Sequence, residues 1–275
     1  MNQLSRLFFV TIAMLVGMVI AVPRSYAAPI IYETGFEPPT FVPGFLVGQD
    51  GWIAPPPLSP NAAVISTDKP RQGKQSVLVP GGDLVHQDFI NDATGGYYDA
   101  IGSYRRPVNY DTGGTQTVRV SAHVRVDGPR TAHDDNFFSA SIGAVAQGEE
   151  DGAPSPEGVG ELAISSDGRV HVYTGADLVP TFLTSARVRL GEWHTLAVEA
   201  NFATRETSFF VDDECLGSFP FDPRVTTDLL LRGSMLTYAA PDTATNHKAD
   251  YAARFDQFKI KVVEPEECEV KGADR

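Results

Sequence analysis

The sequence is poor in positive charge, and this shortage excludes whole classes of partner. Its 275 residues contain 22 Lys and Arg against 35 Asp and Glu, which gives a formal net charge of −13. So acidic a chain is repelled by nucleic acid and by anionic lipid headgroups, and we expect neither as a partner. The acidity fits solubility outside the cytoplasm or a requirement for a cation, and it does not identify a ligand.

Cysteine is also scarce, because Cys215 and Cys268 are the only two. With no third cysteine and no CxxC motif, neither a thiolate zinc site nor a dithiol redox motif is supported. In an exported chain, an even pair predicts a disulfide. The chain-entropy model gives a stabilisation of roughly 4 kcal/mol for a loop of this length. Two unpaired thiols are the alternative.

The sequence contains one long hydrophobic run, which extends from Leu7 to Val22 and follows Arg6. Pro23 and Arg24 end it, and the small residues Ser25 and Ala27 follow, which is typical of a secretory signal peptide covering residues 1–27. An uncleaved anchor is the alternative, but the run has 16 residues, and a membrane span needs roughly 20. Cleavage removes two arginines and changes the net charge to −15.

No second apolar run of that length follows the signal peptide. We therefore expect a secreted, periplasmic or extracellular protein that has no membrane contact after cleavage. No linker and no internal repeat divides the rest of the chain, so residues 28–275 are predicted to form a single domain.

Helical periodicity is almost absent, and short alternating segments separated by Gly, Pro, Asp and Asn take its place. In "TVRVSAHVRV" every second residue from Val118 is apolar, which predicts a strand with one buried face. "GELAISSDGRVHVYTG" predicts a hairpin turned at Asp-Gly. The segments add up to about twelve to fourteen strands, and that number in one domain implies two packed antiparallel sheets.

Three segments in order resemble one family. "GEWHTLAVEANFATRETSFFVDDECLGSF" resembles the late hairpin of concanavalin A-like, laminin-G-like jelly rolls, with Trp193 as a buried anchor at its entry. "YETGFEPPTFVPGFLVGQDGW" resembles the opening of secreted bacterial members, and "ARFDQFKI" resembles their closing strand. The resemblance spans the mature chain and implies an all-β, two-sheet antiparallel jelly-roll sandwich.

The same resemblance implies a structural Ca²⁺ where the first and last strands meet. Glu37 and Asp256 stand at the matching positions, and carboxylate oxygens are ligands that Ca²⁺ prefers. The alternative is that both are exposed charges at a sheet edge.

The family contains glycoside hydrolases and lyases beside lectin-like binders, and each of the two enzyme classes needs its own pattern of catalytic residues. A hydrolase needs two carboxylates in the pattern Glu-x-Asp-x-x-Glu. Glu149 and Asp151 begin such a pattern, but Pro154 breaks it, and residues 148–158 read as an acidic loop. A lyase needs a charge neutraliser and a base on one face, for which Arg119 and His123 are candidates. Outward polar residues on a half-buried strand are the simpler interpretation, so we expect no catalytic residues and lean against an enzyme.

Tyrosines gather in "NDATGGYYDAIGSYRRPVNYD", which the glycines predict to be a mobile loop. A tyrosine exposes an apolar ring with a polar handle, which suits the stacking of a sugar. We therefore name Tyr97, Tyr98, Tyr104 and Arg105 as candidate ligand-binding residues. Rings buried in the core are the alternative.

These observations favour a secreted, non-catalytic carbohydrate-binding or adhesion module whose partner is a glycan or an extracellular surface polymer. A polysaccharide-degrading enzyme, either hydrolase or lyase, is the first alternative. A structural surface protein without a small ligand is the second.

Overall fold

A computed structural model describes residues 28–54, 63–80, 88–91, 96–128, 138–150, 153–174, 179–239, 251–266 and 268. The predicted signal peptide, residues 1–27, lies outside the described part. The description covers the backbone alone at 88–91, 96–102, 138, 150, 154–156, 174, 179–185 and 238–239. Within the described part the elements are all strands, and no helix has the length and apolarity that a bilayer crossing requires.

The strands form two antiparallel sheets. The larger, nine-stranded sheet contains, in spatial order, β14 (Glu214–Pro220), β13 (Glu206–Val211), β12 (His194–Asn201), β7 (Thr117–Asp127), β16 (Ala252–Val263), β4 (Ser76–Pro80), β3 (Val64–Ser66) and β2 (Gly44–Phe45), with β1 (Ile30–Thr34) paired to β16. The seven-stranded sheet contains β11 (Val179–Arg187), β10 (Arg169–Thr174), β9 (Ala153–Ser165), β8 (Phe138–Glu150), β15 (Leu229–Ala239), β6 (Gly96–Asp111) and β5 (Asp88–Asn91).

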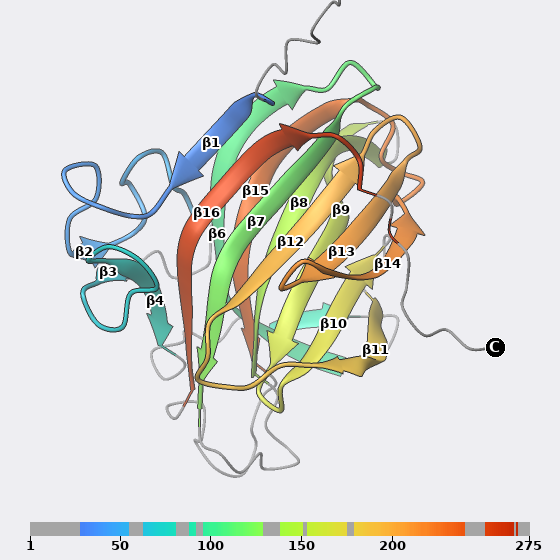
Figure 1. Ribbon diagram of the computed structural model, residues 1–275. Helices are drawn as coiled ribbons and strands as arrows, with labels where there is room; N and C mark the ends of the chain where they lie inside the picture. Colours follow the sequence, from blue (N-terminus) through green and yellow to red (C-terminus); the bar gives the residue numbers. More distant parts are fainter. Residues whose placement is uncertain are drawn as a thin grey trace, which may run out of the picture.

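The two sheets lie face to face, with the nine-stranded sheet toward the viewer in Figure 1 and the seven-stranded sheet behind it. Their inner faces carry the core, because alternate side chains of a strand point to opposite sides of its sheet. On β7 the predicted inward series from Val118 to Val126 is at most 2% exposed. On β12 Leu196, Val198 and Ala200 are fully buried. The all-β sandwich predicted from the sequence is therefore confirmed.

The predicted hairpins are present as well. β9 and β10 pair around a turn whose Gly168 has a φ of +79°. β13 and β14 pair around Asp212 and Asp213, with φ values of +50° and +63°. Two consecutive positive φ values are typical of a type I′ turn, in which Asp is one of the residues tolerated without glycine. The "VDD" turn thus forms with aspartates at the position where the resemblance predicts a glycine.

Three sequence predictions about local structure are wrong. Residues 96–111 of the segment predicted to be a mobile tyrosine loop form β6, which pairs with β15 from Asp99 to Asp111. Residues 148–158, predicted to be a loop, belong largely to the ends of β8 and β9, which pair as far as Glu150 and Ala153. Trp193 is only partly buried, whereas Trp52 is fully buried against the Phe258 ring at 5.0 Å between centroids.

The predicted disulfide between Cys215 and Cys268 is present, with a Cα–Cα distance of 5.5 Å. It ties the end of the described chain to β14, at the edge of the nine-stranded sheet. The C-terminal segment therefore lies against the outer face of that sheet.

Candidate functional site

The outer face of the seven-stranded sheet is polar, although its side chains are buried. Ser141 on β8 is 0% exposed, His171 on β10 is 2% and Ser234 on β15 is 3%. Their immediate neighbours along each strand, such as Ile142 and Met235, belong to the apolar core between the sheets. Because successive side chains alternate between faces, the polar residues point away from that core. We call this surface the outer polar face.

The strand register aligns these side chains in a row. Arg105 on β6 lies opposite Ser234, which lies opposite Gly143 on β8. Gly143 lies opposite Glu161 on β9, and Glu161 lies opposite Tyr173 on β10. Directly opposed residues share a face. The row therefore crosses five strands, and at the usual strand spacing it is about 19 Å long.

One end of the row combines a carboxylate, a hydroxyl and two rings. The Ser141 hydroxyl donates to Oε1 of Glu161 at 2.6 Å. The rings of His171 and Tyr173 are stacked, with centroids 6.4 Å apart and planes 18° apart. Burial lowers the pKa of His171, a shift that the charge of Asp167 opposes and that of Arg169 reinforces. His171 is therefore neutral at pH 7 and is able to donate and to accept hydrogen bonds.

The other end of the row carries two arginines. Arg105 donates from Nε to the Ser103 hydroxyl at 3.1 Å. Arg232 on β15 lies opposite Pro107, two residues along β6 from Arg105. Burial lowers the pKa of Arg232 to about 10, and the positive charge of Arg105 adds to the shift. The Arg105 backbone also forms a β-bridge with Ile53, whose side chain is 46% exposed.

The structure places the predicted ligand-binding residues in different environments. Arg105 lies in the row, as described. Tyr104 is a correction: it is 0% exposed and belongs to the core, because it alternates with Arg105 on the same strand. Burial raises its pKa. Tyr97 and Tyr98 belong to β6, for which the structure describes only the backbone at these two positions.

Glu37, named for calcium, holds the loop between β3 and β4. Its Oε1 accepts the backbone N–H groups of Lys74 at 2.7 Å and Gln75 at 3.0 Å. A side chain at Gly73 would overlap the Glu37 carboxylate, and Gly73 has a φ of +67°. The glycine therefore lets the carboxylate approach the loop.

Asp256 holds the same loop from β16. Its Oδ2 accepts the backbone N–H groups of Arg71 at 2.9 Å and Gln72 at 3.0 Å, and its Oδ1 accepts that of Gln257 at 2.8 Å. The residue is 0% exposed. Burial raises the pKa of Asp256; the three backbone hydrogen bonds oppose the shift and the charge of Glu37 adds to it.

The structure thus brings Glu37 and Asp256 together, with backbone amides rather than open space at their oxygens. Five N–H groups already occupy three of the four carboxylate oxygens. Across the described residues there is also no group of three or more His, Cys, Asp or Glu placed to hold a metal. This donor set does not fit a calcium cage, and the calcium site stays a prediction from resemblance.

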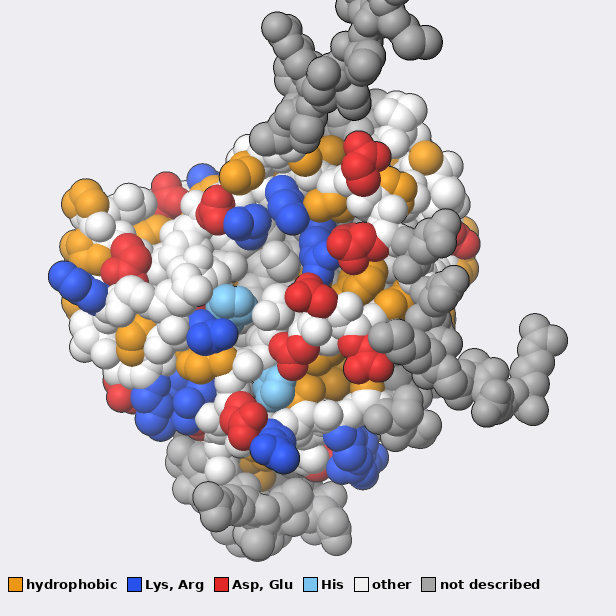
Figure 2. Space-filling view, in the orientation of Figure 1, with side chains coloured by type: hydrophobic (Ala, Val, Ile, Leu, Met, Phe, Trp, Pro, Cys, Tyr) orange, Lys and Arg blue, Asp and Glu red, His pale blue; other side chains and the backbone are white. Residues whose placement is uncertain are grey.

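The outer face of the nine-stranded sheet is charged in a different way. Figure 2 shows acidic and basic side chains interspersed over it. Arg119 on β7 is ion-paired to Glu199 at 3.0 Å, to Asp213 at 3.2 Å and to Glu266 at 3.4 Å. Its guanidinium also lies over the ring of Phe210 at 5.0 Å from the centroid. Burial raises the pKa of Glu199, and the charge of Arg119 opposes that shift. The positive charge of Arg119 is therefore compensated within the chain by these carboxylates.

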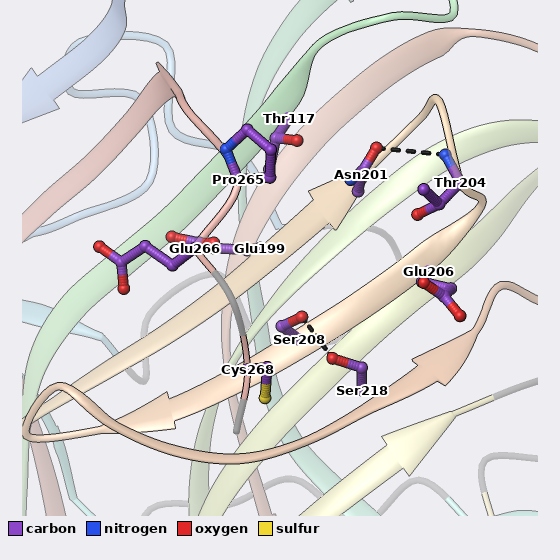
Figure 3. Close-up of a pocket in the computed structure, with 10 residues that line it drawn as sticks. All are labelled: Thr117, Glu199, Asn201, Thr204, Glu206, Ser208, Ser218, Pro265, Glu266 and Cys268. Atoms are coloured by element: carbon purple, nitrogen blue, oxygen red, sulfur yellow. Dashed lines mark hydrogen bonds between the residues drawn. The ribbon is translucent and has the colours of Figure 1, made fainter. Parts of the chain in front are cut away.

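A cavity of about 180 Å³ opens on this second face, between the strands and the C-terminal segment (Figure 3). Within it Ser208 and Ser218 share a hydrogen bond of 2.6 Å. The lining residues are Thr117, Glu199, Asn201, Thr204, Glu206, Ser208, Ser218, Pro265, Glu266 and Cys268. Two of its lining residues already have structural roles, because Glu199 is ion-paired to Arg119 and Cys268 forms the disulfide. We therefore do not assign a ligand to this cavity.

Sequence reasoning missed most of the outer polar face. It placed the candidate lyase residues Arg119 and His123 on β7, which belongs to the other sheet. The signal for Glu161, Ser141 and Ser234 was a single polar residue at alternate positions of otherwise apolar segments. Such residues occur in many strands, and only the register between strands shows that they form a row.

The comparisons with known proteins concern the fold. No protein-family model matches the chain, and no curated protein is a significant match. An endo-1,3-beta-glucanase from Streptomyces sioyaensis superposes with a TM-score of 0.54 at 13% identity, over 88% of this chain and 100% of that chain. The fold is a two-sheet antiparallel jelly-roll sandwich.

A second jelly roll of similar size gives the same result. A carbohydrate esterase from Shiga toxin-encoding bacteriophage phi24B superposes with a TM-score of 0.52 at 14% identity, over 86% of this chain and 100% of that chain. A sialidase matches at a TM-score of 0.43 and 13% identity, and this chain spans 17% of its length. At these identities the likeness establishes the architecture alone.

Proposed function

We propose that this protein is a secreted carbohydrate-binding module that holds a glycan along the outer polar face. The observation that carries the proposal is the row from Arg105 through Ser234 and Glu161 to Tyr173. A row of donors, acceptors and a ring across five strands suits an extended ligand. Binding sites in general combine apolar lining with a few placed polar groups.

Sugars are the class of ligand that this mixture matches. Their hydroxyls both donate and accept, which suits the Glu161 carboxylate as an acceptor and the Arg105 guanidinium as a donor. Their carbon faces stack on rings such as that of Tyr173. The fold likeness to an endo-1,3-beta-glucanase and a carbohydrate esterase supports the same class.

Binding without catalysis is favoured by the spacing of the groups. A retaining glycosidase needs two carboxylates about 5 Å apart. Among the described side chains of the row, Glu161 is the one carboxylate. A lyase needs its base and its charge neutraliser at one sugar unit. Here His171 and Arg232 stand three strands apart, about 14 Å at the usual strand spacing.

Export is the proposed location. The predicted signal peptide at residues 1–27 supports it, and so does the disulfide between Cys215 and Cys268, since disulfides persist in oxidising compartments. The partner is then a glycan or polymer met outside the cytoplasm.

A glycan array combined with product analysis tests this function. We expect the mature chain to bind one class of glycan, and prolonged incubation with that glycan to release neither reducing ends nor unsaturated sugars. The variant Glu161→Gln should weaken binding about tenfold, because it replaces a charged acceptor by a neutral amide.

The other outcomes separate the alternatives. Release of either product would make the protein a polysaccharide-degrading enzyme, which the stacked His171 and Tyr173 beside Glu161 would then serve. Silence in both assays together with self-association would favour a structural surface protein.

A further inference from the structure

Arg232 and Arg105 form a cationic corner on the outer polar face. β6 and β15 are paired, with Arg105 opposite Ser234 and Arg232 opposite Pro107. The two arginines are therefore diagonal neighbours on one face, and diagonal pairs lie about 7–8 Å apart, within reach of long side chains. Burial lowers the pKa of the Arg232 guanidinium, and the positive charge of Arg105 lowers it further.

Among the described residues, Arg232 lacks the carboxylate partner that the two most buried arginines, Arg119 and Arg254, have. Arg119 pairs with Glu199 at 3.0 Å, and Arg254 pairs with Asp127 at 2.9 Å. Within the described part of the chain, no ion pair involves Arg232, and its buried Nε has no hydrogen-bond partner. A buried charge that is not compensated destabilises the fold, and a like charge beside it adds to the cost.

We propose that Arg232 and Arg105 form a subsite for an anionic group on the bound glycan, either a carboxylate or a sulfate. This inference rests on the function proposed above and names the class of sugar. A guanidinium binds both groups with two parallel hydrogen bonds. The bound anion supplies the negative charge that no described residue provides at Arg232.

The net charge of the protein does not prevent this. The Debye length at 0.15 M salt is about 8 Å, so charges elsewhere on the surface are largely screened at the corner. The two arginines and the ligand's anion are in direct contact, where screening is weakest. The net charge of −13 is expected to slow the encounter rather than to decide the affinity.

The experiment compares matched polymers by titration calorimetry at 0.15 M salt. Polygalacturonate is paired with its carboxyl-reduced form, and dextran sulfate with dextran, so that each pair differs only in the anion. We expect one anionic polymer to bind at least tenfold more tightly than its neutral counterpart, and the preferred pair identifies carboxylate or sulfate. Arg232→Gln and Arg105→Gln should each remove most of that preference.

Two controls separate the subsite from general effects. Arg189→Gln removes an arginine that is 85% exposed in its side chain and lies outside the outer polar face, and it should keep the wild-type preference. Arg232→Gln should melt no lower than the wild type, because it removes an uncompensated charge. Arg232→Lys keeps the charge without the planar fork and should retain part of the preference.

The results also distinguish the two proposals. The subsite is wrong and the proposed function stands if a neutral glycan binds and none of the anionic polymers is preferred. The subsite is likewise wrong if an anionic polymer is preferred and both Arg232 variants retain the full preference. If no glycan binds here or on the array, both proposals fail.

Discussion

Buried charges in this protein differ in whether the chain itself compensates them. On the nine-stranded sheet Arg119 and Arg254 each have carboxylate partners within the chain. On the outer polar face Arg232 has none among the described residues. Buried charges are normally paired, so an unpaired one at a surface is a candidate for binding.

The buried charges that are paired within the chain predict how stability depends on pH, and Asp127 is the example. Its carboxylate accepts from Arg125 at 2.7 Å and from Arg254 at 2.9 Å. Burial alone would raise the pKa of Asp127, but the hydrogen bonds from these arginines outweigh it and the pKa is lowered. Asp127→Asn should therefore lower the free energy of unfolding by about 1–3 kcal/mol at pH 7.

The sign of the pH dependence follows from linkage. A lowered folded pKa stabilises above the unfolded value of about 3.9 and is lost as the pH falls through the folded pKa. Urea unfolding at pH 7 and at pH 2 to 3 measures the difference between the two proteins. The cost of Asp127→Asn should shrink in acid, and a cost that stayed constant would contradict the account. Asp213→Asn, whose side chain is 84% exposed, is the matched control and should cost little at either pH.

At the scale of elements, the sequence was informative about strands with one clean period and uninformative about register. β7 and the β9–β10 hairpin were predicted because their apolar residues alternate. The glycines and tyrosines of residues 96–111 interrupt the alternation and predict a loop, yet these residues form β6, which pairs with β15 from Asp99 to Asp111. Pairing between strands distant in sequence decides which polar residues become neighbours. That pairing could not be predicted from a single sequence.

The loop between β3 and β4 gives a prediction at this scale. Glu37 accepts two of its backbone N–H groups. Glu37→Ala leaves them without their acceptor and should lower the free energy of unfolding by about 1–3 kcal/mol, equally with and without EDTA. Thermal melting of the wild type and the variant, each with calcium and with EDTA, measures this.

The calcium prediction gives the opposite pattern in the same experiment. If a cation bridges Glu37 and Asp256, EDTA lowers the melting temperature of the wild type and leaves that of Glu37→Ala unchanged. Such a result would show that the amide contacts are not the main role of Glu37.

At the scale of the whole molecule, the jelly roll has two outer faces, and we propose different roles for them. The nine-stranded face is closed by internal ion pairs, a disulfide and the C-terminal segment. The seven-stranded face carries a row of polar groups with Arg232 at one end, and Arg232 has no ion-pair partner in the part of the chain that the structure describes. The sequence predicted the sandwich and the disulfide, which the structure confirms, and it named Arg105, whose role in binding stays a prediction. The row itself follows only from the register.

The direct test is the affinity of variants on each face for the glycan that the array identifies. Tyr173→Ala and Ser234→Ala alter the outer polar face, and Ser208→Ala and Ser218→Ala alter the cavity on the other face as matched controls. With all four variants folded, calorimetry should show losses of about tenfold for the first pair and less than about twofold for the second. Losses confined to the cavity variants would contradict the assignment of the binding face.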